Sequence, residues 1–178
     1  TSVAQPRNAY GSSKLAVENI LKDYSRAYDI RCVALRYFNV AGYDTEAEPQ
    51  QIRYQSNKLI DIIIDTAHKN QTFKINGNNH PTKDGTCVRD YVHVMDVAEA
   101  NIKALNYCRD NKEFEVFNVG SGVPTSNMEI INEVQRHLGK INTEVGEARQ
   151  EISYSLADIS KAKEILDWIP AKSSIDKI

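Results

Sequence analysis

Residues 9–40, AYGSSKLAVENILKDYSRAYDIRCVALRYFNV, decide the fold. In residues 9–28 apolar side chains recur at steps of three and four, which predicts a helix with one apolar face. After Asp29, residues 30–40 are apolar on both faces and rich in β-favouring residues, until Gly42 ends the run. Such a segment is typical of a buried strand in a parallel sheet. A helix, a short turn and a buried strand form half of a doubly wound α/β unit.

Helices and strands are predicted to alternate along the rest of the chain. Apolar periodicity and β-rich runs predict helices at about residues 57–69, 96–107, 126–138 and 161–166, and strands at about residues 72–75, 90–94, 115–119 and 141–145. Asp96 is the expected cap of the second of these helices, and Ser126 with Glu129 forms an expected capping box at the third. Asp158 or Ser160 is expected to cap the last.

The composition is that of an ordinary globular protein, because 41% of the 178 residues are hydrophobic and 26% are charged. With 22 basic against 24 acidic residues, the formal net charge of −2 argues against nucleic acid as a partner. No apolar run approaches the ~20 residues of a membrane-spanning helix, and residues 1–10 do not resemble a secretion signal. Three widely spaced cysteines are expected to be free thiols in a reducing cytoplasm, and no local spacing predicts a metal site.

Tyr10 and Lys14 are the first candidate for chemistry. Residues four apart on a helix lie on one face, so the phenol and the ammonium point into the same volume. A nearby cation stabilises the phenolate, and a tyrosine of this kind can take a proton from an alcohol or a sugar hydroxyl. The alternative is an ordinary solvated helix face.

Motifs in five places make the chain similar to the extended short-chain dehydrogenase/reductase family. Tyr10 and Lys14 match its Tyr-x-x-x-Lys pair, and residues 35–42, LRYFNVAG, match the end of the strand that follows. Residues 84–96, DGTCVRDYVHVMD, resemble the signature of its UDP-glucose 4-epimerase branch. Residues 117–122, FNVGSG, and 157–168, ADISKAKEILDW, resemble two later blocks in the same order.

The resemblance implies an α/β fold: the rear part of a doubly wound Rossmann-type parallel sheet plus a smaller α/β substrate-binding domain. Residues 1–43 and 92–122 would belong to the NAD-binding domain, and residues 44–91 and 123–178 to the UDP-sugar domain. The family's glycine-rich NAD loop lies upstream of its Tyr-x-x-x-Lys pair and is absent from this sequence, so these residues alone are expected to be inactive. Gly120-Ser121-Gly122 lacks the third glycine of such a loop and is expected to be structural.

The resemblance also implies roles around the cofactor and a partner. Tyr10 would be the general base toward the sugar 4-hydroxyl, and Lys14 would hold the nicotinamide ribose of NAD and favour the phenolate. Tyr37 and Phe38 would pack the nicotinamide end. The helix over residues 9–28 would form part of a homodimer interface.

On the substrate side, Asn39 would contact the phosphates of a UDP-sugar, and Asn57 or Lys58 would occupy another substrate position. Arg89 would bind the diphosphate, because a guanidinium matches phosphate oxygens and keeps its charge when partly buried. The alternative for Arg89 is an ion pair with Asp84 or Asp90.

Three later residues complete the substrate side. Arg149 would be a second diphosphate arginine, and Glu151 would hold the uridine ribose, provided that one residue is deleted relative to the family pattern. Ser155 falls where family members limit the sugar pocket. A small residue there leaves room for an N-acetyl group.

The leading hypothesis is therefore an NAD-dependent UDP-hexose 4-epimerase that acts on UDP-glucose and UDP-galactose, with the N-acetyl forms as further substrates. A second is a sugar-nucleotide 4,6-dehydratase or decarboxylase on the same frame. A third is a non-catalytic nucleotide-sugar-binding fragment.

Overall fold

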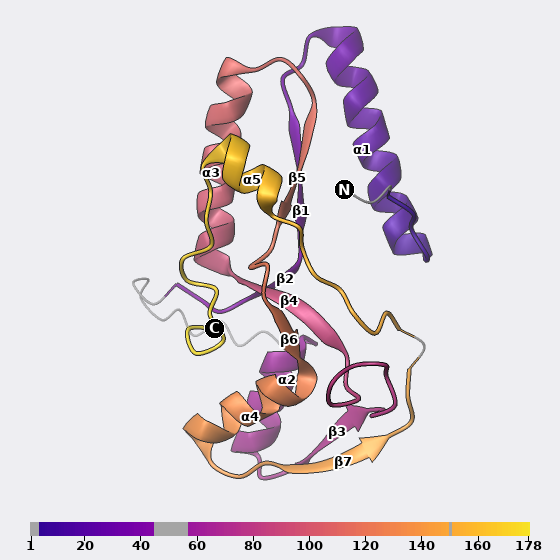
Figure 1. Ribbon diagram of the computed structural model, residues 1–178, viewed down its shortest axis with the longest axis vertical. Coiled ribbons are helices and arrows are strands. Elements are labelled where there is room, and N and C mark those ends of the chain that lie inside the picture. Colours follow the sequence, from indigo (N-terminus) through magenta and orange to yellow (C-terminus); the bar gives the residue numbers. More distant parts are fainter. Residues whose placement is uncertain (1–3, 45–56, 150) are drawn as a thin grey trace.

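The computed structural model describes residues 4–44, 57–149 and 151–178. Its elements follow one another as α1 (Ala9–Tyr28), β1 (Val33–Tyr37), β2 (Asn39–Ala41), α2 (Leu59–His68), β3 (Thr72–Asn76), β4 (Val88–His93), α3 (Val94–Asp110), β5 (Glu115–Val119), β6 (Pro124–Ser126), α4 (Asn127–Leu138), β7 (Asn142–Gly146) and α5 (Ser160–Leu166). The molecule is elongated, with α1, α3, α5, β1 and β5 at one end and α2, α4, β3 and β7 at the other (Figure 1). The predicted α/β class is confirmed.

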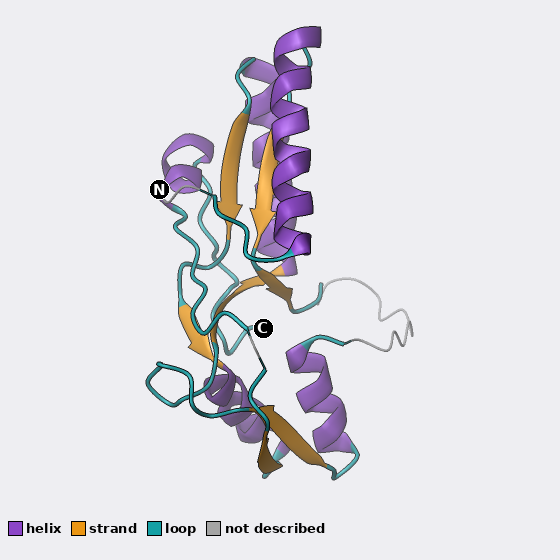
Figure 2. Cartoon of the chain, turned by 90° about the vertical axis from the view of Figure 1, so that its right-hand side faces the viewer, coloured by secondary structure: helices purple, strands orange, loops and turns teal. Residues whose placement is uncertain are grey.

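At the first end, β1 and β5 pair in parallel, from Val33 opposite Glu115 to Tyr37 opposite Val119. Helix α1 lies on one side of this pair, and α3 and α5 lie on the other (Figures 1 and 2). The core here is built on Phe117 and Trp168, both fully buried. The Trp168 indole N–H donates to the Asp96 carbonyl at 2.9 Å, so the C-terminal segment is tied to α3.

Strand β4 joins the two ends of the molecule. It pairs in parallel with β2 on one side and antiparallel with β6 on the other. The sequence did not predict β6, which has three residues and little periodicity to detect. The expected single strand over residues 30–40 is instead two strands: it breaks at Phe38, whose N–H donates to the Val119 carbonyl at 3.0 Å.

The start of α3 corrects the expected cap. The helix begins at Val94, and its N-cap is His93, whose Nδ1 accepts from the Met95 N–H at 3.1 Å. Asp96 lies inside the first turn, and its buried carboxylate accepts hydrogen bonds from the Lys172 N–H and the Ser173 hydroxyl. The helix also continues past the expected end, to Asp110.

At the second end, β3 and β7 pair in parallel beside α2 and α4. Ile63 and Ile131 are the most buried residues of this second core. The predicted capping box is confirmed: the Ser126 hydroxyl accepts from the Glu129 N–H, and the Glu129 carboxylate accepts from the Ser126 N–H.

The expected cap of the last helix, Asp158 or Ser160, is wrong. The N-cap of α5 is Ile159, with no side-chain cap, while Asp158 accepts from the Ser160 N–H and hydroxyl.

The division into two domains stays a prediction. Within it, residues 157–168, assigned to the UDP-sugar part, supply Ala157, Ile159 and Trp168 to the core around β1 and β5. Among the described residues, none of the helices combines the length and apolar character needed to cross a bilayer.

Candidate functional site

Helix α1 presents the predicted Tyr10–Lys14 pair. The Asn8 side chain caps the helix by accepting from the Gly11 N–H at 2.8 Å, which starts the helix just before Tyr10. The Lys14 ammonium nitrogen lies 5.2 Å from the centroid of the Tyr10 ring. Tyr10 is 71% exposed, so its hydroxyl is open to a ligand.

A fork between Arg36 and Glu18 holds this helix against the sheet. Arg36 Nε and Nη2 donate to the two Glu18 carboxylate oxygens at 2.7 and 2.6 Å. The hydrogen bond to Glu18 raises the pKa of Arg36 above its ordinary value, against the opposing effect of burial. Because Arg36 lies near the end of β1, the fork fixes how α1 lies beside that strand end.

Two neighbouring grooves contain most of the predicted cofactor and phosphate residues. A groove of about 690 Å³ is lined by Tyr10, Lys14 and Tyr37, among others. A second, of about 660 Å³, is lined by Phe38, Asn39 and Lys58 among its residues. The structure thus separates Tyr37 from Phe38, although they are adjacent in sequence and were assigned one role.

Asn57 and Lys58 lie differently relative to this groove. Lys58 lines it and its ammonium donates to the Val40 carbonyl at 3.3 Å, whereas Asn57 is exposed just before α2 and is not among the lining residues. The substrate role of either residue is still a prediction.

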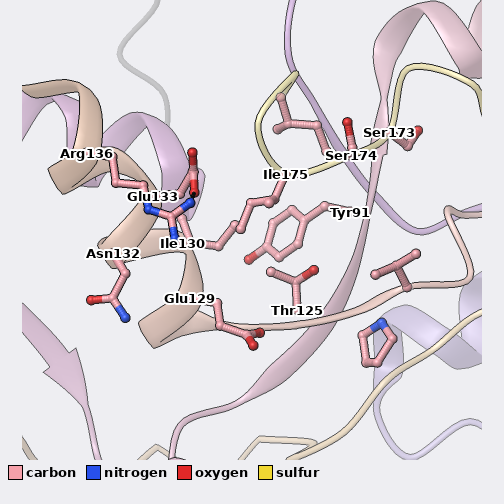
Figure 3. Close-up of a pocket in the computed structure, with 13 residues that line it drawn as sticks. Tyr91, Thr125, Glu129, Ile130, Asn132, Glu133, Arg136, Ser173, Ser174 and Ile175 are labelled. Atoms are coloured by element: carbon pink, nitrogen blue, oxygen red, sulfur yellow. Dashed lines mark hydrogen bonds and ion pairs between the residues drawn. The ribbon is translucent and has the colours of Figure 1, made fainter.

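Tyr91 is a residue of interest that the sequence analysis missed. It is 6% exposed, and burial raises the pKa of its hydroxyl, while a hydrogen bond with the Asn39 side chain acts in the opposite direction. Tyr91 lines the groove of Asn39 and also a pocket of about 430 Å³ between α4 and the C-terminal segment. Figure 3 shows it there among Thr125, Ile130 and Ile175. Its place next to Arg89 and Asp90 in the sequence was the available signal.

Arg89 and Glu151 meet although they are 62 residues apart. Arg89 Nη2 donates to Glu151 Oε2 at 2.7 Å, and its Nη1 donates to the Val88 carbonyl at 2.9 Å. The alternative pairing of Arg89 with Asp84 or Asp90 is wrong. The Asp84 carboxylate accepts from Thr86 and Ser126, and Asp90 is engaged elsewhere.

Asp90 explains the Gly120-Ser121-Gly122 segment. Its buried carboxylate accepts from the N–H groups of Ser121 at 2.5 Å, Gly122 at 2.9 Å and Ala157 at 3.1 Å, and from the Ser121 hydroxyl at 2.8 Å. The amides that a phosphate would need are therefore already used by a side chain of the same protein, which confirms the structural interpretation of this segment.

The two remaining predicted residues lie on the segment that follows β7. Arg149 is exposed. Ser155 is half-buried, and its N–H donates to the Val88 carbonyl at 3.0 Å, which places it beside β4. None of the pockets above is lined by either residue.

The Arg89–Glu151 pair has two further neighbours that the sequence analysis did not select. Cys87 is 2% exposed and its Sγ lies 3.3 Å from His80 Nε2. Burial raises the pKa of the Cys87 thiol; the Glu151 carboxylate also raises it, and Arg89 opposes both. The contact between His80 and Cys87 could not be predicted from the sequence, because it depends on the path of the loop between β3 and β4.

Comparison with known proteins shows the family of the chain. The model of the NAD dependent epimerase/dehydratase family matches residues 1–120. The UDP-glucose 4-epimerase of Lacticaseibacillus casei is 42% identical over 176 residues, which cover 97% of this chain and 53% of that protein.

Solved structures share the fold. The UDP-glucose 4-epimerase of Bifidobacterium longum, in complex with NAD+ and UDP, matches with a TM-score of 0.86 and 30% identity over 99% of this chain and 54% of that one. The UDP-Glc/GlcNAc 4-epimerase of Campylobacter jejuni matches with a TM-score of 0.77 and 35% identity over 99% and 54%. The chain spans about half the length of the curated relatives it matches. It belongs to the NAD dependent epimerase/dehydratase family.

Proposed function

We propose that the natural protein containing this chain is an NAD-dependent UDP-hexose 4-epimerase. The single observation that carries the proposal is the Tyr10–Lys14 pair on α1, with the ammonium 5.2 Å from the phenol ring and the hydroxyl open to a groove of about 690 Å³. The L. casei and B. longum proteins, named UDP-glucose 4-epimerases, support the choice of reaction.

The groove suits the nicotinamide end of NAD, because it offers a cation at Lys14, a phenol at Tyr10 and the apolar wall of Leu15 and Leu35. NAD bound in this groove would supply the acceptor, and then the donor, of the hydride. Tyr10 accepts the proton of the sugar 4-hydroxyl while the carbon that bears it is oxidised, and gives the proton back after the sugar has turned its other face. Lys14 would orient the ribose beside the Tyr10 hydroxyl.

On the substrate side, Arg89 supplies a fixed guanidinium for the diphosphate of a UDP-sugar. Glu151, already within 2.7 Å of Arg89, would accept from the uridine ribose, with Asn39 and Arg149 as further phosphate contacts. Arg149 is exposed and therefore accessible to a ligand.

The test is interconversion of UDP-galactose and UDP-glucose by the full natural polypeptide. Tyr10→Phe should lower kcat about 10²–10⁴-fold, the usual contribution of a general base. Tyr24→Phe is the matched control, since Tyr24 is also exposed on α1, 53%, but does not line the groove. A product that has lost water would favour the dehydratase alternative. Binding of UDP without turnover would favour the third alternative, a non-catalytic protein that binds nucleotide sugars. The inactivity expected of the 178 residues alone is tested in the same assay.

Two finer proposals concern specificity and assembly. Ser155 would admit an N-acetyl group, in line with the C. jejuni protein named for UDP-Glc and GlcNAc. Ser155→Tyr should therefore lower kcat/KM for UDP-N-acetylgalactosamine more than for UDP-galactose. A homodimer would cover the exposed apolar side chains Ile20 and Tyr28 on α1, which do not line the groove. Light scattering of wild type and Ile20→Lys would test this.

A further inference from the structure

The loop between β3 and β4 and the segment after β7 bring three metal-ligating side chains to one point. His80 and Cys87 lie seven residues apart in the loop, and Glu151 comes from the other segment. One ligand atom of each, an imidazole nitrogen, the thiol sulfur and a carboxylate oxygen, lies within 4.8 Å of the other two. We propose that His80, Cys87 and Glu151 form a binding site for a thiophilic divalent cation of the Zn²⁺ class.

The spacing of the first two ligands is close to what tetrahedral zinc requires. With Zn–S about 2.3 Å and Zn–N about 2.0 Å, a tetrahedral angle separates the two ligand atoms by about 3.5 Å. Cys87 Sγ and His80 Nε2 are 3.3 Å apart. Glu151 has two carboxylate oxygens, so one can bind the cation while Oε2 keeps its contact with Arg89. Three protein ligands leave a fourth position open to water or to a ligand.

The second nitrogen of His80 is held as in a metal site. His80 Nδ1 lies 3.0 Å from the Ser153 hydroxyl oxygen. With the proton on Nδ1, that nitrogen donates to Ser153 and Nε2 carries the lone pair that faces Cys87. A partner on the other ring nitrogen is the usual way in which proteins fix a ligating histidine. Binding of the cation releases the Cys87 thiol proton to solvent, with no change of oxidation state.

Hydrogen bonds fix the backbone around the three proposed ligands. The His80 N–H donates to the Gly85 carbonyl at 2.9 Å. Gly85 has φ +76°, and a Cβ there would lie 1.9 Å from the Asn78 carbonyl oxygen, so the turn between the two ligands accepts only glycine. The Val88 N–H donates to the Ser153 carbonyl at 2.9 Å, which holds the segment that contains Glu151 beside Cys87.

A cation here would share Glu151 with the proposed UDP site and would lie next to Arg89. This consequence rests on the proposed function: a metal bound to Glu151 removes the acceptor of the uridine ribose, so the cation and UDP are expected to compete. The ligand set, with a thiolate and an imidazole, suits Zn²⁺ or Co²⁺ and not Mg²⁺ or Ca²⁺.

The experiment is titration of the full natural polypeptide with Co²⁺, which reports thiolate ligation by a charge-transfer band. It is made in a Cys32→Ser/Cys108→Ser background, because these two half-buried thiols lie near each other. We expect one equivalent of Co²⁺ to saturate the band, Zn²⁺ to displace it and Mg²⁺ to have no effect. Cys87→Ser, or His80→Gln as a second variant, should abolish the band, and Ser153→Ala should weaken affinity about tenfold.

The outcomes separate this site from the proposed function. The metal site is refuted if the parent protein shows no band, or if the band persists in Cys87→Ser. Either result holds independently of whether UDP binds. With simple competition, UDP at ten times its own Kd should raise the apparent Kd for Co²⁺ about elevenfold. If the band depends on Cys87 but the apparent Kd for Co²⁺ does not change when UDP is bound, the metal site is supported. The proposal that UDP contacts Glu151 is then refuted.

Discussion

Replacing Asp90 with asparagine should destabilise the protein, because the buried Asp90 carboxylate accepts four hydrogen bonds. Each carboxylate oxygen accepts two hydrogen bonds: Oδ1 from the Ser121 N–H and hydroxyl, and Oδ2 from the N–H groups of Gly122 and Ala157. An asparagine has one such oxygen, and its NH₂ would face donors. Two buried donors therefore lose their acceptor.

Hydrogen bonds to a charged group contribute about 1.5–3 kcal/mol each, so losing two should cost about 3–6 kcal/mol. The assay is urea unfolding of the full natural polypeptide, followed by circular dichroism. With a slope of about 2 kcal/mol per M, the midpoint should fall by about 1.5–3 M. Asp23→Asn, the same change at an exposed position of α1, should alter stability by less than about 0.5 kcal/mol.

Ser121→Ala keeps the prediction testable if the asparagine variant does not fold. It removes the hydroxyl that donates to Asp90 at 2.8 Å and accepts from the Val123 N–H at 3.0 Å, and should cost about 1–3 kcal/mol. If Asp90→Asn lowers the free energy of unfolding by less than about 1 kcal/mol, the reasoning is refuted. The conformation of Gly120-Ser121-Gly122 would then not depend on this carboxylate.

Three further changes test other contacts. Trp168→Phe should cost about 2–4 kcal/mol in urea unfolding, since the Asp96 carbonyl loses the indole N–H and a fully buried side chain loses volume. Glu18→Gln should cost about 1 kcal/mol by opening the fork to Arg36, and proteolysis should release α1 faster. Burial alone would raise the pKa of Asp84, but hydrogen bonds from Ser126 and Thr86 lower it overall. The stability from its carboxylate is thus present above the ordinary carboxyl pKa and lost as the pH falls through the lowered value, so the deficit of Asp84→Asn should shrink below about pH 4 in unfolding curves.

Local sequence signals predicted most elements because their causes are local. Helix α1 runs over the expected residues 9–28, and the capping box at Ser126 and Glu129 forms as expected. The errors occur where tertiary contacts override local preference. Asp96 has the chemistry of a cap, but the buried hydroxyl of Ser173 and the Lys172 N–H take its carboxylate, and His93 caps α3 instead.

The candidate site divides in the same way. Tyr10 and Lys14 could be paired from the sequence, since helical spacing alone puts them on one face. The separation of Tyr37 and Phe38 into two grooves could not, because it depends on the break between β1 and β2.

The order of helices and strands, the Tyr10–Lys14 pair and the family resemblance could be predicted, because they depend on spacing along one segment. The pairing of Arg89 with Glu151, and the position of His80 and Cys87 beside them, depend on tertiary contacts. That meeting follows from the bridge between Val88 and Tyr154, which sets two distant segments in parallel. Such a register is chosen by the packing of the whole chain, and no local pattern encodes it.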